Sequence, residues 1–221
     1  MTIVVVSDLH IDDTDQNMGL VESLCDAILI QHPDTLVLNG DIDDPWKAAR
    51  ADIHETDSWD ELRRMVTRRY DRGLRTIWIA NNHDHGAKPK YLPGCEVMTR
   101  YAEGRYVFVH GWEFDGVWNI ISPVAFLITT RFPRLMVPIY HLLYGNRTPG
   151  QKKAAGASDW TLGVETIHSR ARLRAKKEKK IYIIGHTHCP VPFDGLIANA
   201  GDLTDRTYVW IDGDKVEMRR F

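Results

Sequence analysis

Five short motifs in the chain carry aspartate, asparagine and histidine side chains at spacings that suit metal binding. In chain order they are Asp8-Leu9-His10, Gly40-Asp41, Asn82-His83-Asp84, His110-Gly111 and Gly185-His186-Thr187-His188. Carboxylate, amide and imidazole groups are ligands for divalent transition metals, and two such ions held side by side can attack a phosphate ester. Each motif alone is common in surface turns. Their joint occurrence predicts a two-metal hydrolytic site.

Each motif directly follows an apolar run that is typical of a buried strand. Strands are predicted over residues 2–6, 35–38, 74–80, 105–109 and 180–184. Helices are predicted over residues 16–31, 58–72 and about 158–177, the second with Asp57 or Ser58 as its N-cap. This alternation indicates a largely parallel sheet covered by helices, whose strands end at one edge. The motifs should therefore lie together. The tail, residues 196–221, predicts antiparallel edge strands.

The order of the motifs resembles that of the calcineurin-like metallophosphoesterase family over almost the whole chain. The resemblance implies an α/β fold, a four-layer α/β/β/α sandwich of two mixed sheets with a helical insert. Residues 1–221 would form a single metallophosphoesterase domain, with residues 117–178 as a helical cap or insert within it. Asn81 stands where the family has glycine. Because asparagine tolerates unusual backbone angles, we expect the turn to survive.

Carried over residue by residue, the resemblance also implies a role for each motif. The first metal would be held by Asp8, His10, Asp41 and His188. The second would be held by Asp41, Asn82, His110 and His186, with Asp41 bridging the two ions. His83 would be catalytic, stabilising the phosphoryl oxygens or protonating the leaving oxygen, and Asp84 would orient its imidazole. A metal-bridging hydroxide would attack phosphorus. We expect two divalent ions, manganese first, although iron, zinc, nickel or cobalt would suit these ligands.

Within the family, the chain resembles the branch around UDP-2,3-diacylglucosamine pyrophosphatase without matching that enzyme. Its length, the run from Ser7 to His10 and the position of Trp46 near Asp41 agree with that branch, but His83 stands where the branch has arginine. We therefore expect a hydrolase of phosphomonoester, phosphodiester or pyrophosphate bonds. Its partner would be a phosphorylated small-molecule or lipid-linked substrate.

Two other enzymes and one binding protein are alternatives. A formal net charge of -2 gives no global basic field, so we expect no dedicated nucleic-acid binding and disfavour a nuclease. A phosphoprotein phosphatase is the other enzymatic alternative. A non-catalytic protein-binding scaffold of the same fold typically loses metal ligands or the catalytic histidine, and the sequence keeps them all.

Two further segments leave alternatives open. Residues 117–144 are apolar and could cap the site, contact a membrane surface, or pack as a helical hairpin on the domain or in a homodimer interface. Arg131 and three prolines interrupt this stretch, so it does not predict a membrane span. The basic run 170–180 could recruit phosphate-rich substrates, anionic lipid or nucleic acid, or simply be a solvated helix face. The N-terminus lacks a signal-peptide pattern, so we expect a cytoplasmic protein, with peripheral membrane contact as an option.

Overall fold

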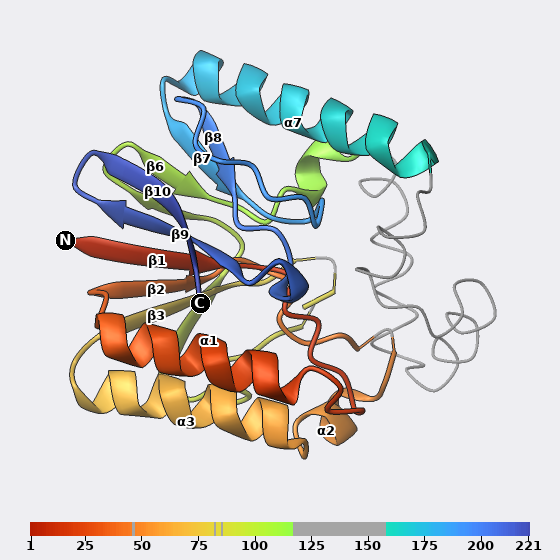
Figure 1. Ribbon diagram of the computed structural model, residues 1–221, viewed down its shortest axis with the longest axis vertical. Coiled ribbons are helices and arrows are strands. Elements are labelled where there is room, and N and C mark those ends of the chain that lie inside the picture. The colour runs from red at the N-terminus through yellow and green to blue at the C-terminus, as the bar shows by residue number, and fades with distance from the viewer. Residues whose placement is uncertain (46, 82, 85, 117–157) are drawn as a thin grey trace.

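Two mixed β-sheets lie face to face, with helices on both outer sides (Figure 1). The computed structural model describes residues 1–45, 47–81, 83–84, 86–116 and 158–221. The first sheet has the order β10-β9-β1-β2-β3-β4 and the second the order β5-β6-β7-β8. Strands β1 to β4 are parallel, as are β6 to β8, whereas β9, β10 and β5 pair antiparallel with their neighbours.

The elements of the first half come in β–α alternation, as the sequence predicts. They are β1 (Thr2–Val6), α1 (Met18–Gln31), β2 (Thr35–Leu38), α2 (Arg50–Ile53), α3 (Asp57–Asp71), β3 (Arg75–Ile79) and β4 (Cys95–Met98). The second half contains β5 (Tyr101–Glu103), β6 (Tyr106–Phe108), η1 (Trp112–Phe114), α7 (Ser158–Glu178), β7 (Ile181–Ile184), β8 (Ile197–Asn199), η2 (Leu203–Asp205), β9 (Thr207–Asp212) and β10 (Lys215–Arg220).

Alternation along β1 divides the core into layers. Val4 and Val6 pack toward α1 and α3, whereas Ile3 and Val5 pack between the two sheets. Successive side chains of a strand point to opposite faces, so one continuous apolar run can serve two cores. A third cluster joins the second sheet to α7. These layers confirm the α/β/β/α sandwich.

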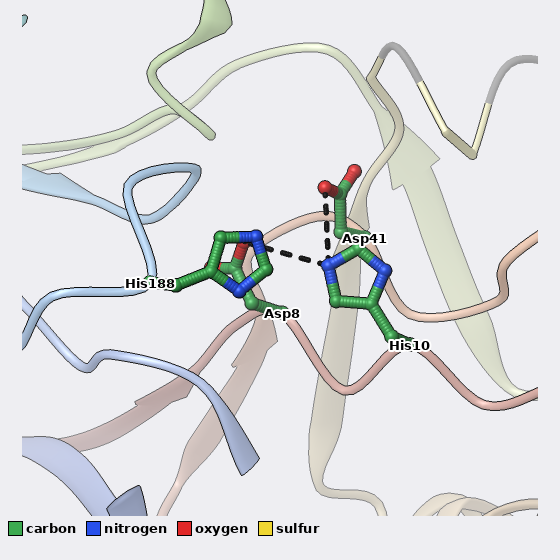
Figure 2. A group of neighbouring side chains, drawn as sticks. All are labelled: Asp8, His10, Asp41 and His188. Atoms are coloured by element: carbon green, nitrogen blue, oxygen red, sulfur yellow. Dashed lines mark ion pairs between the residues drawn. The ribbon is translucent and has the colours of Figure 1, made fainter. Parts of the chain in front are cut away.

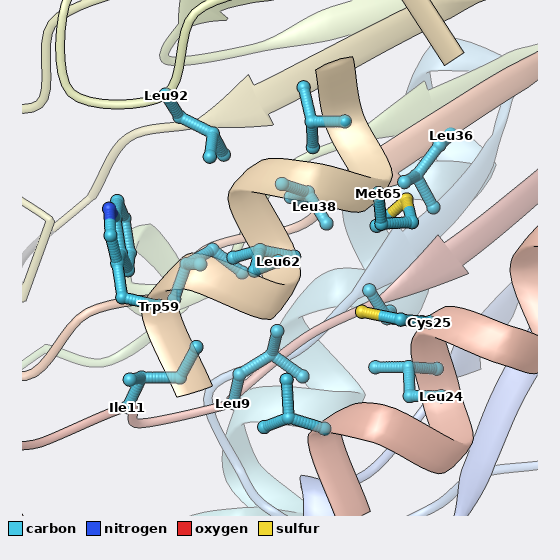
Figure 3. Packing of buried hydrophobic residues seen from close by; sticks show 14 of the residues in the cluster. Leu9, Ile11, Leu24, Cys25, Leu36, Leu38, Trp59, Leu62, Met65 and Leu92 are labelled. Carbon is cyan, nitrogen blue, oxygen red and sulfur yellow. The ribbon is translucent and has the colours of Figure 1, made fainter. Parts of the chain in front are cut away.

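Helix α3 buries one face against the first sheet. Figure 3 shows Trp59, Leu62 and Met65 packed among residues of β2 and α1, and all three are fully buried. The helix begins one residue earlier than predicted, and its N-cap is Thr56, whose hydroxyl accepts a hydrogen bond from the Trp59 amide at 3.2 Å. The expectation of Asp57 or Ser58 as the cap is therefore wrong.

The tail divides between the sheets. Strand β9 pairs antiparallel with β1, with Ile3 opposite Ile211, and β10 forms the edge beyond it. Strand β8 instead pairs parallel with β7 in the second sheet, so the prediction of an entirely antiparallel tail is wrong for this strand. Residues 117–157, which include the apolar stretch 117–144, lie outside the described residues. None of the described helices has the length and apolar character needed to cross a bilayer.

Candidate metal centre

The loops that follow β1, β2, β6 and β7 meet where the two sheets face each other. The Asp8 amide donates to the Gly40 carbonyl at 3.0 Å, which extends the pairing of β1 with β2 beyond the strands. Across the junction, the His186 amide donates to both carboxylate oxygens of Asp8, at 3.1 and 3.2 Å. The Gly185 amide donates to the His110 carbonyl at 2.7 Å. Hydrogen bonds donated by backbone amides, including those from His186 to the Asp8 carboxylate, thus bring motifs from both halves of the sequence together.

The backbone of these loops is unusual. Nine described non-glycine residues have positive φ. Five of them are Asp8, His10, Asp41, His186 and His188, with φ between 47° and 68°. Such conformations cost about 1–3 kcal/mol each and collect at functional sites. Their concentration on the predicted ligands marks this junction as a site that the surrounding fold holds in place.

Two glycines permit the close approach of the loops. A Cβ on Gly40 would lie 2.5 Å from His110 Nδ1, and a Cβ on Gly185 would lie 2.6 Å from Asp8 Oδ2. Contacts shorter than 3.0 Å are essentially never made by real Cβ atoms. The site can therefore assemble only because both positions are glycine, which has no Cβ atom.

Four buried side chains form a first cluster of donors. Asp8, His10, Asp41 and His188 place ligand atoms within 4.8 Å of one another and point toward a common centre (Figure 2). His10 Nε2 lies 3.6 Å from Asp41 Oδ2, and His188 Nε2 lies 3.6 Å from Asp8 Oδ1. These are the residues expected to hold the first metal.

A second cluster shares Asp41 with the first. Asp41, His110 and His186 also place ligand atoms within 4.8 Å of one another, and His110 Nε2 lies 3.3 Å from Asp41 Oδ2. One carboxylate therefore faces both clusters, as expected of a bridging ligand. Asn82, the remaining predicted ligand, lies outside the described residues.

Buried polar atoms in both clusters fit a metal. His10 Nε2, His110 Nε2 and Asp41 Oδ1 are buried without a hydrogen-bond partner among the described residues, and leaving buried polar groups unsatisfied costs roughly 1–3 kcal/mol each. Two donors that each lie about 2.1 Å from one ion are roughly 3.0–3.5 Å apart. The distances in both clusters are close to this spacing, and the imidazole and carboxylate donors suit divalent transition metals.

Comparison with known proteins agrees with this geometry. The sequence profile of calcineurin-like phosphoesterases matches residues 1–192. The chain belongs to the calcineurin-like phosphoesterase family. This phosphoesterase is similar in fold to a dimetal phosphatase from Danio rerio, with a TM-score of 0.50 and 10% identity over 100% of this chain and 95% of that chain. The comparison with curated proteins found no match.

Two further solved structures are similar at a lower level. The phosphoesterase Yfce from E. coli has a TM-score of 0.46 and 13% identity, over 98% of this chain and 91% of that chain. A conserved protein from Streptococcus pneumoniae, described as a predicted phosphoesterase, has a TM-score of 0.41 and 18% identity, over 99% and 88%. The family assignment rests on the sequence profile, which supports a metal-dependent phosphoesterase with a dinuclear centre.

Acceptors in the segment that follows β2 orient His10 and His110. His10 Nδ1 lies 3.3 Å from Asp44 Oδ2, and His110 Nδ1 lies 2.9 Å from the Asn39 carbonyl oxygen. In both rings Nε2 is the nitrogen that faces Asp41. Such outer partners fix the tautomer and orientation of a metal-binding imidazole. Asp44 belongs to none of the five motifs, although it lies only three residues after Asp41.

The histidines of the last motif have outer carboxylates as well. His188 Nδ1 lies 3.6 Å from Asp202 Oδ2, so its Nε2 again faces the cluster. In His186 the nitrogen that meets the outer carboxylate is Nε2 rather than Nδ1, and it lies 3.4 Å from Asp115 Oδ2. Neither acid belongs to a ligand motif, and no spacing in the sequence would have identified them.

His83 stands beside the clusters, but Asp84 does not contact it as expected. His83 Nδ1 lies 3.1 Å from Asp44 Oδ1, and its Nε2 lies 4.0 Å from Asp41 Oδ2. Asp84 accepts hydrogen bonds from the Trp78 indole at 2.8 Å and the Ile42 amide at 2.9 Å. The carboxylate that orients His83 is therefore Asp44, and Asp84 instead holds the loop that carries Asp41.

The turn around His83 survives the exchange of glycine for asparagine. The Asn81 side-chain oxygen accepts hydrogen bonds from the backbone amides of His83, at 3.0 Å, and Asp84, at 3.2 Å. A side chain that bonds its own backbone two residues on favours such a turn. Asn81 thus stabilises the turn in place of the family glycine.

The site concentrates negative charge that attracts cations. Burial opposes ionisation, yet the charges of His110 and His83 hold the pKa of Asp41 well below its usual range. Burial also lowers the pKa of His110, but the charges of Asp41 and Asp8 outweigh it and raise that pKa to about 10. Without a metal, protons on the neighbouring imidazoles compensate the charge of these carboxylates. A bound metal ion takes over that role, so metal binding releases protons.

Proposed function

We propose that this phosphoesterase hydrolyses a phosphate ester or anhydride bond of a small or lipid-linked substrate. The observation that carries the proposal is the placement of His83, with Nδ1 held by Asp44 and Nε2 directed toward Asp41. A protein-binding scaffold would require no imidazole oriented toward the metal clusters. The position is the one from which a side chain can donate to a phosphoryl or leaving-group oxygen.

The buried clusters supply ligands for two divalent ions. The first would be held by Asp8, His10, Asp41 and His188, and the second by Asp41, His110 and His186 together with Asn82. When bound, a pair of such ions polarises phosphoryl oxygens and acidifies water. Manganese is our first choice, with iron, zinc, nickel and cobalt as alternatives that the same ligands accept.

The chain's own contribution is to position a proton. Burial lowers the pKa of His83, but the charges of Asp41 and Asp44 outweigh it, so that the pKa is raised. The imidazolium therefore persists to higher pH than in a free histidine. With Nδ1 directed to Asp44, the Nε2 proton is left for an oxygen of the substrate. His83 would stabilise the phosphoryl group or protonate the leaving oxygen.

A substrate panel tests the proposal. Metal-stripped protein, reconstituted in turn with each of the five metals, is assayed on an aryl phosphomonoester, an aryl phosphodiester, a nucleoside diphosphate and a UDP-sugar lipid. A phosphopeptide and single-stranded DNA represent the alternative activities. We expect metal-dependent turnover on the small or lipid-linked substrates, and His83→Ala serves as the blank for contaminating phosphatases.

Other outcomes would exclude the proposal. A preference for the phosphopeptide would indicate a phosphoprotein phosphatase, and a preference for DNA would indicate a nuclease. Folded protein that binds no metal and hydrolyses none of the substrates would indicate a scaffold.

A further inference from the structure

A pocket lies on the outer side of the second sheet, beneath α7. The helix packs against β7, β8 and η1, and it crosses the outer face of this sheet (Figure 1). Between the helix, η1 and the turn before β5 lies a pocket with a volume of about 490 Å³. This volume falls within the range of small-molecule sites, roughly 300–1,000 Å³. We call it the α7 pocket; its lining includes Arg100, Phe114, Arg170, Arg174, Lys177 and Tyr182.

Two guanidinium groups of the pocket are fixed by one carboxylate. Glu178 accepts a hydrogen bond from Arg100 at 2.9 Å and forms an ion pair with Arg174. The Tyr182 hydroxyl donates to the same carboxylate at 2.6 Å. Each guanidinium has five N–H donors, so both retain donors after pairing. The two arginines are thus held in place for a further anion, which lowers the entropy cost of binding it.

The other two cations are not neutralised by a carboxylate among the described residues. Arg170 donates to the Phe114 carbonyl oxygen at 2.7 Å, which is a neutral acceptor. Lys177 is exposed and makes no hydrogen bond or ion pair with a described residue. Four cations therefore face two carboxylates, Glu178 and the lining residue Glu113, in a chain whose net charge is -2. This surplus favours an anionic ligand.

The floor of the pocket is apolar. The rings of Phe114 and Tyr182 meet edge to face with centroids 6.0 Å apart. Leu173, which also lines the pocket, is 66% exposed and is one of few large apolar side chains on the described surface. Covering such surface contributes about 25 cal/mol per Å² of apolar area. The chemistry of the pocket therefore suits a ligand that joins an anionic group to an apolar one.

The end of the α7 pocket that carries Arg100, Arg174, Lys177 and Tyr182 is separate from the metal centre. Tyr182 lies near the start of β7 and packs with the residues that face α7, whereas His186 follows the end of that strand. Four residues of extended chain span roughly 13 Å. A ligand in this pocket would therefore be bound without contact between its phosphate and the metal ligands.

We propose that the α7 pocket binds an organic phosphate that carries an apolar group, at a second site distinct from the hydrolytic centre. The phosphate contacts the guanidiniums of Arg100 and Arg174 and the Lys177 ammonium, and the apolar group covers Phe114 and Leu173. The proposal does not depend on the substrate of the enzyme.

The test follows the methyl signals of Leu173 by NMR, which report on the pocket and not on the metal centre. The probes are octyl phosphate below its micellar concentration, inorganic phosphate and octyl glucoside. We expect a saturable shift with octyl phosphate, weaker binding of inorganic phosphate, and no saturable shift with the uncharged glucoside. Lys177→Glu should weaken the binding of octyl phosphate about tenfold or more, because a carboxylate that repels the phosphate replaces an ammonium that attracts it.

Lys176→Glu is the matched control, because Lys176 is exposed on the same helix but does not line the pocket. It should bind octyl phosphate as the wild type does, and both variants should hydrolyse an aryl phosphate at the wild-type rate. Co-sedimentation with phosphatidic acid vesicles distinguishes a lipid source from a soluble one. Equal binding by both variants, equal shifts with octyl glucoside, or no shift with octyl phosphate would overturn the proposal.

Discussion

The two sheets contribute different chemistry to one centre. The loops of the first sheet bring the carboxylates, Asp8 after β1 and Asp41 after β2, together with His10 and His83. Among the described residues, the second sheet contributes only imidazoles to the clusters, from His110 after β6 and from His186 and His188 after β7. Neither side alone holds both the negative charge and the full set of nitrogen donors. The centre therefore exists only where the two sheets face each other.

The two sides are also held in different ways. Asp8 and Asp41 lie in loops whose backbones hydrogen-bond to each other, and Asp8 also accepts the His186 amide. Among the described residues, the second sheet brings no carboxylate to the clusters, and its imidazoles, like His10 beside Asp44, are each oriented by an outer acceptor, such as Asp115 or Asp202. Substitution of a first-sheet carboxylate should therefore abolish metal binding and activity. Substitution of an acid that orients a second-sheet histidine should only weaken metal affinity.

The largest effect is expected from Asp41→Asn, because this carboxylate faces both clusters. Loss of its charge should reduce turnover of an aryl phosphate about a thousandfold or more, since metal-based charge stabilisation contributes several kcal/mol. Metal content is measured in parallel. Asp71→Asn, on the exposed end of α3, is the control and should be unchanged. Wild-type rates for metal-loaded Asp41→Asn would contradict the bridging role.

His83→Ala should separate catalysis from metal binding on the same side of the site. Removal of a positioned acid typically lowers turnover about 10²–10⁴-fold, while the clusters around Asp41 keep their donors. We expect steady-state kinetics to show this loss and metal analysis to show unchanged stoichiometry. The exposed His32, exchanged for alanine, provides the control. A variant that loses its metals together with its activity would make His83 a ligand instead.

The first-sheet side was largely predictable from the sequence, because buried β-branched runs such as residues 2–6 and 35–38 end directly at polar motifs. The parallel sheet and the meeting of the motifs at one edge of it follow from that pattern, whereas the two-sheet architecture was implied only by the resemblance to the calcineurin-like phosphoesterases. The supporting acids were not predictable, because Asp115 and Asp202 reach the site from separate loops through tertiary packing. The role given to Asp84 was wrong for a similar reason, since burial beside Trp78 directs its carboxylate away from His83.

Asp115→Asn tests whether loss of an acid that orients a second-sheet histidine only weakens metal binding. Outer partners of metal-binding histidines typically contribute about 10–100-fold in metal affinity, and only His186 contacts this carboxylate among the described histidines. Calorimetric titration of manganese should show one weakened site and one site with wild-type affinity. Asp212→Asn, at the exposed end of β9, is the control. Equal weakening of both sites would indicate a general disturbance rather than a local one.

Gly185→Ala should show how closely the two sides must approach. Its Cβ would lie 2.6 Å from Asp8 Oδ2 and 2.8 Å from Ser7 Cβ, so a methyl group would push the second-sheet loop away from the first. Such overpacking costs about 1–3 kcal/mol in the free energy of unfolding, which urea denaturation of the metal-free protein measures. Gly19→Ala, where a methyl group meets nothing within 4 Å, should not be destabilised. If Gly185→Ala were equally stable and bound manganese normally, the loops would have room to separate, and the close contact between the sheets would not be a condition for the centre.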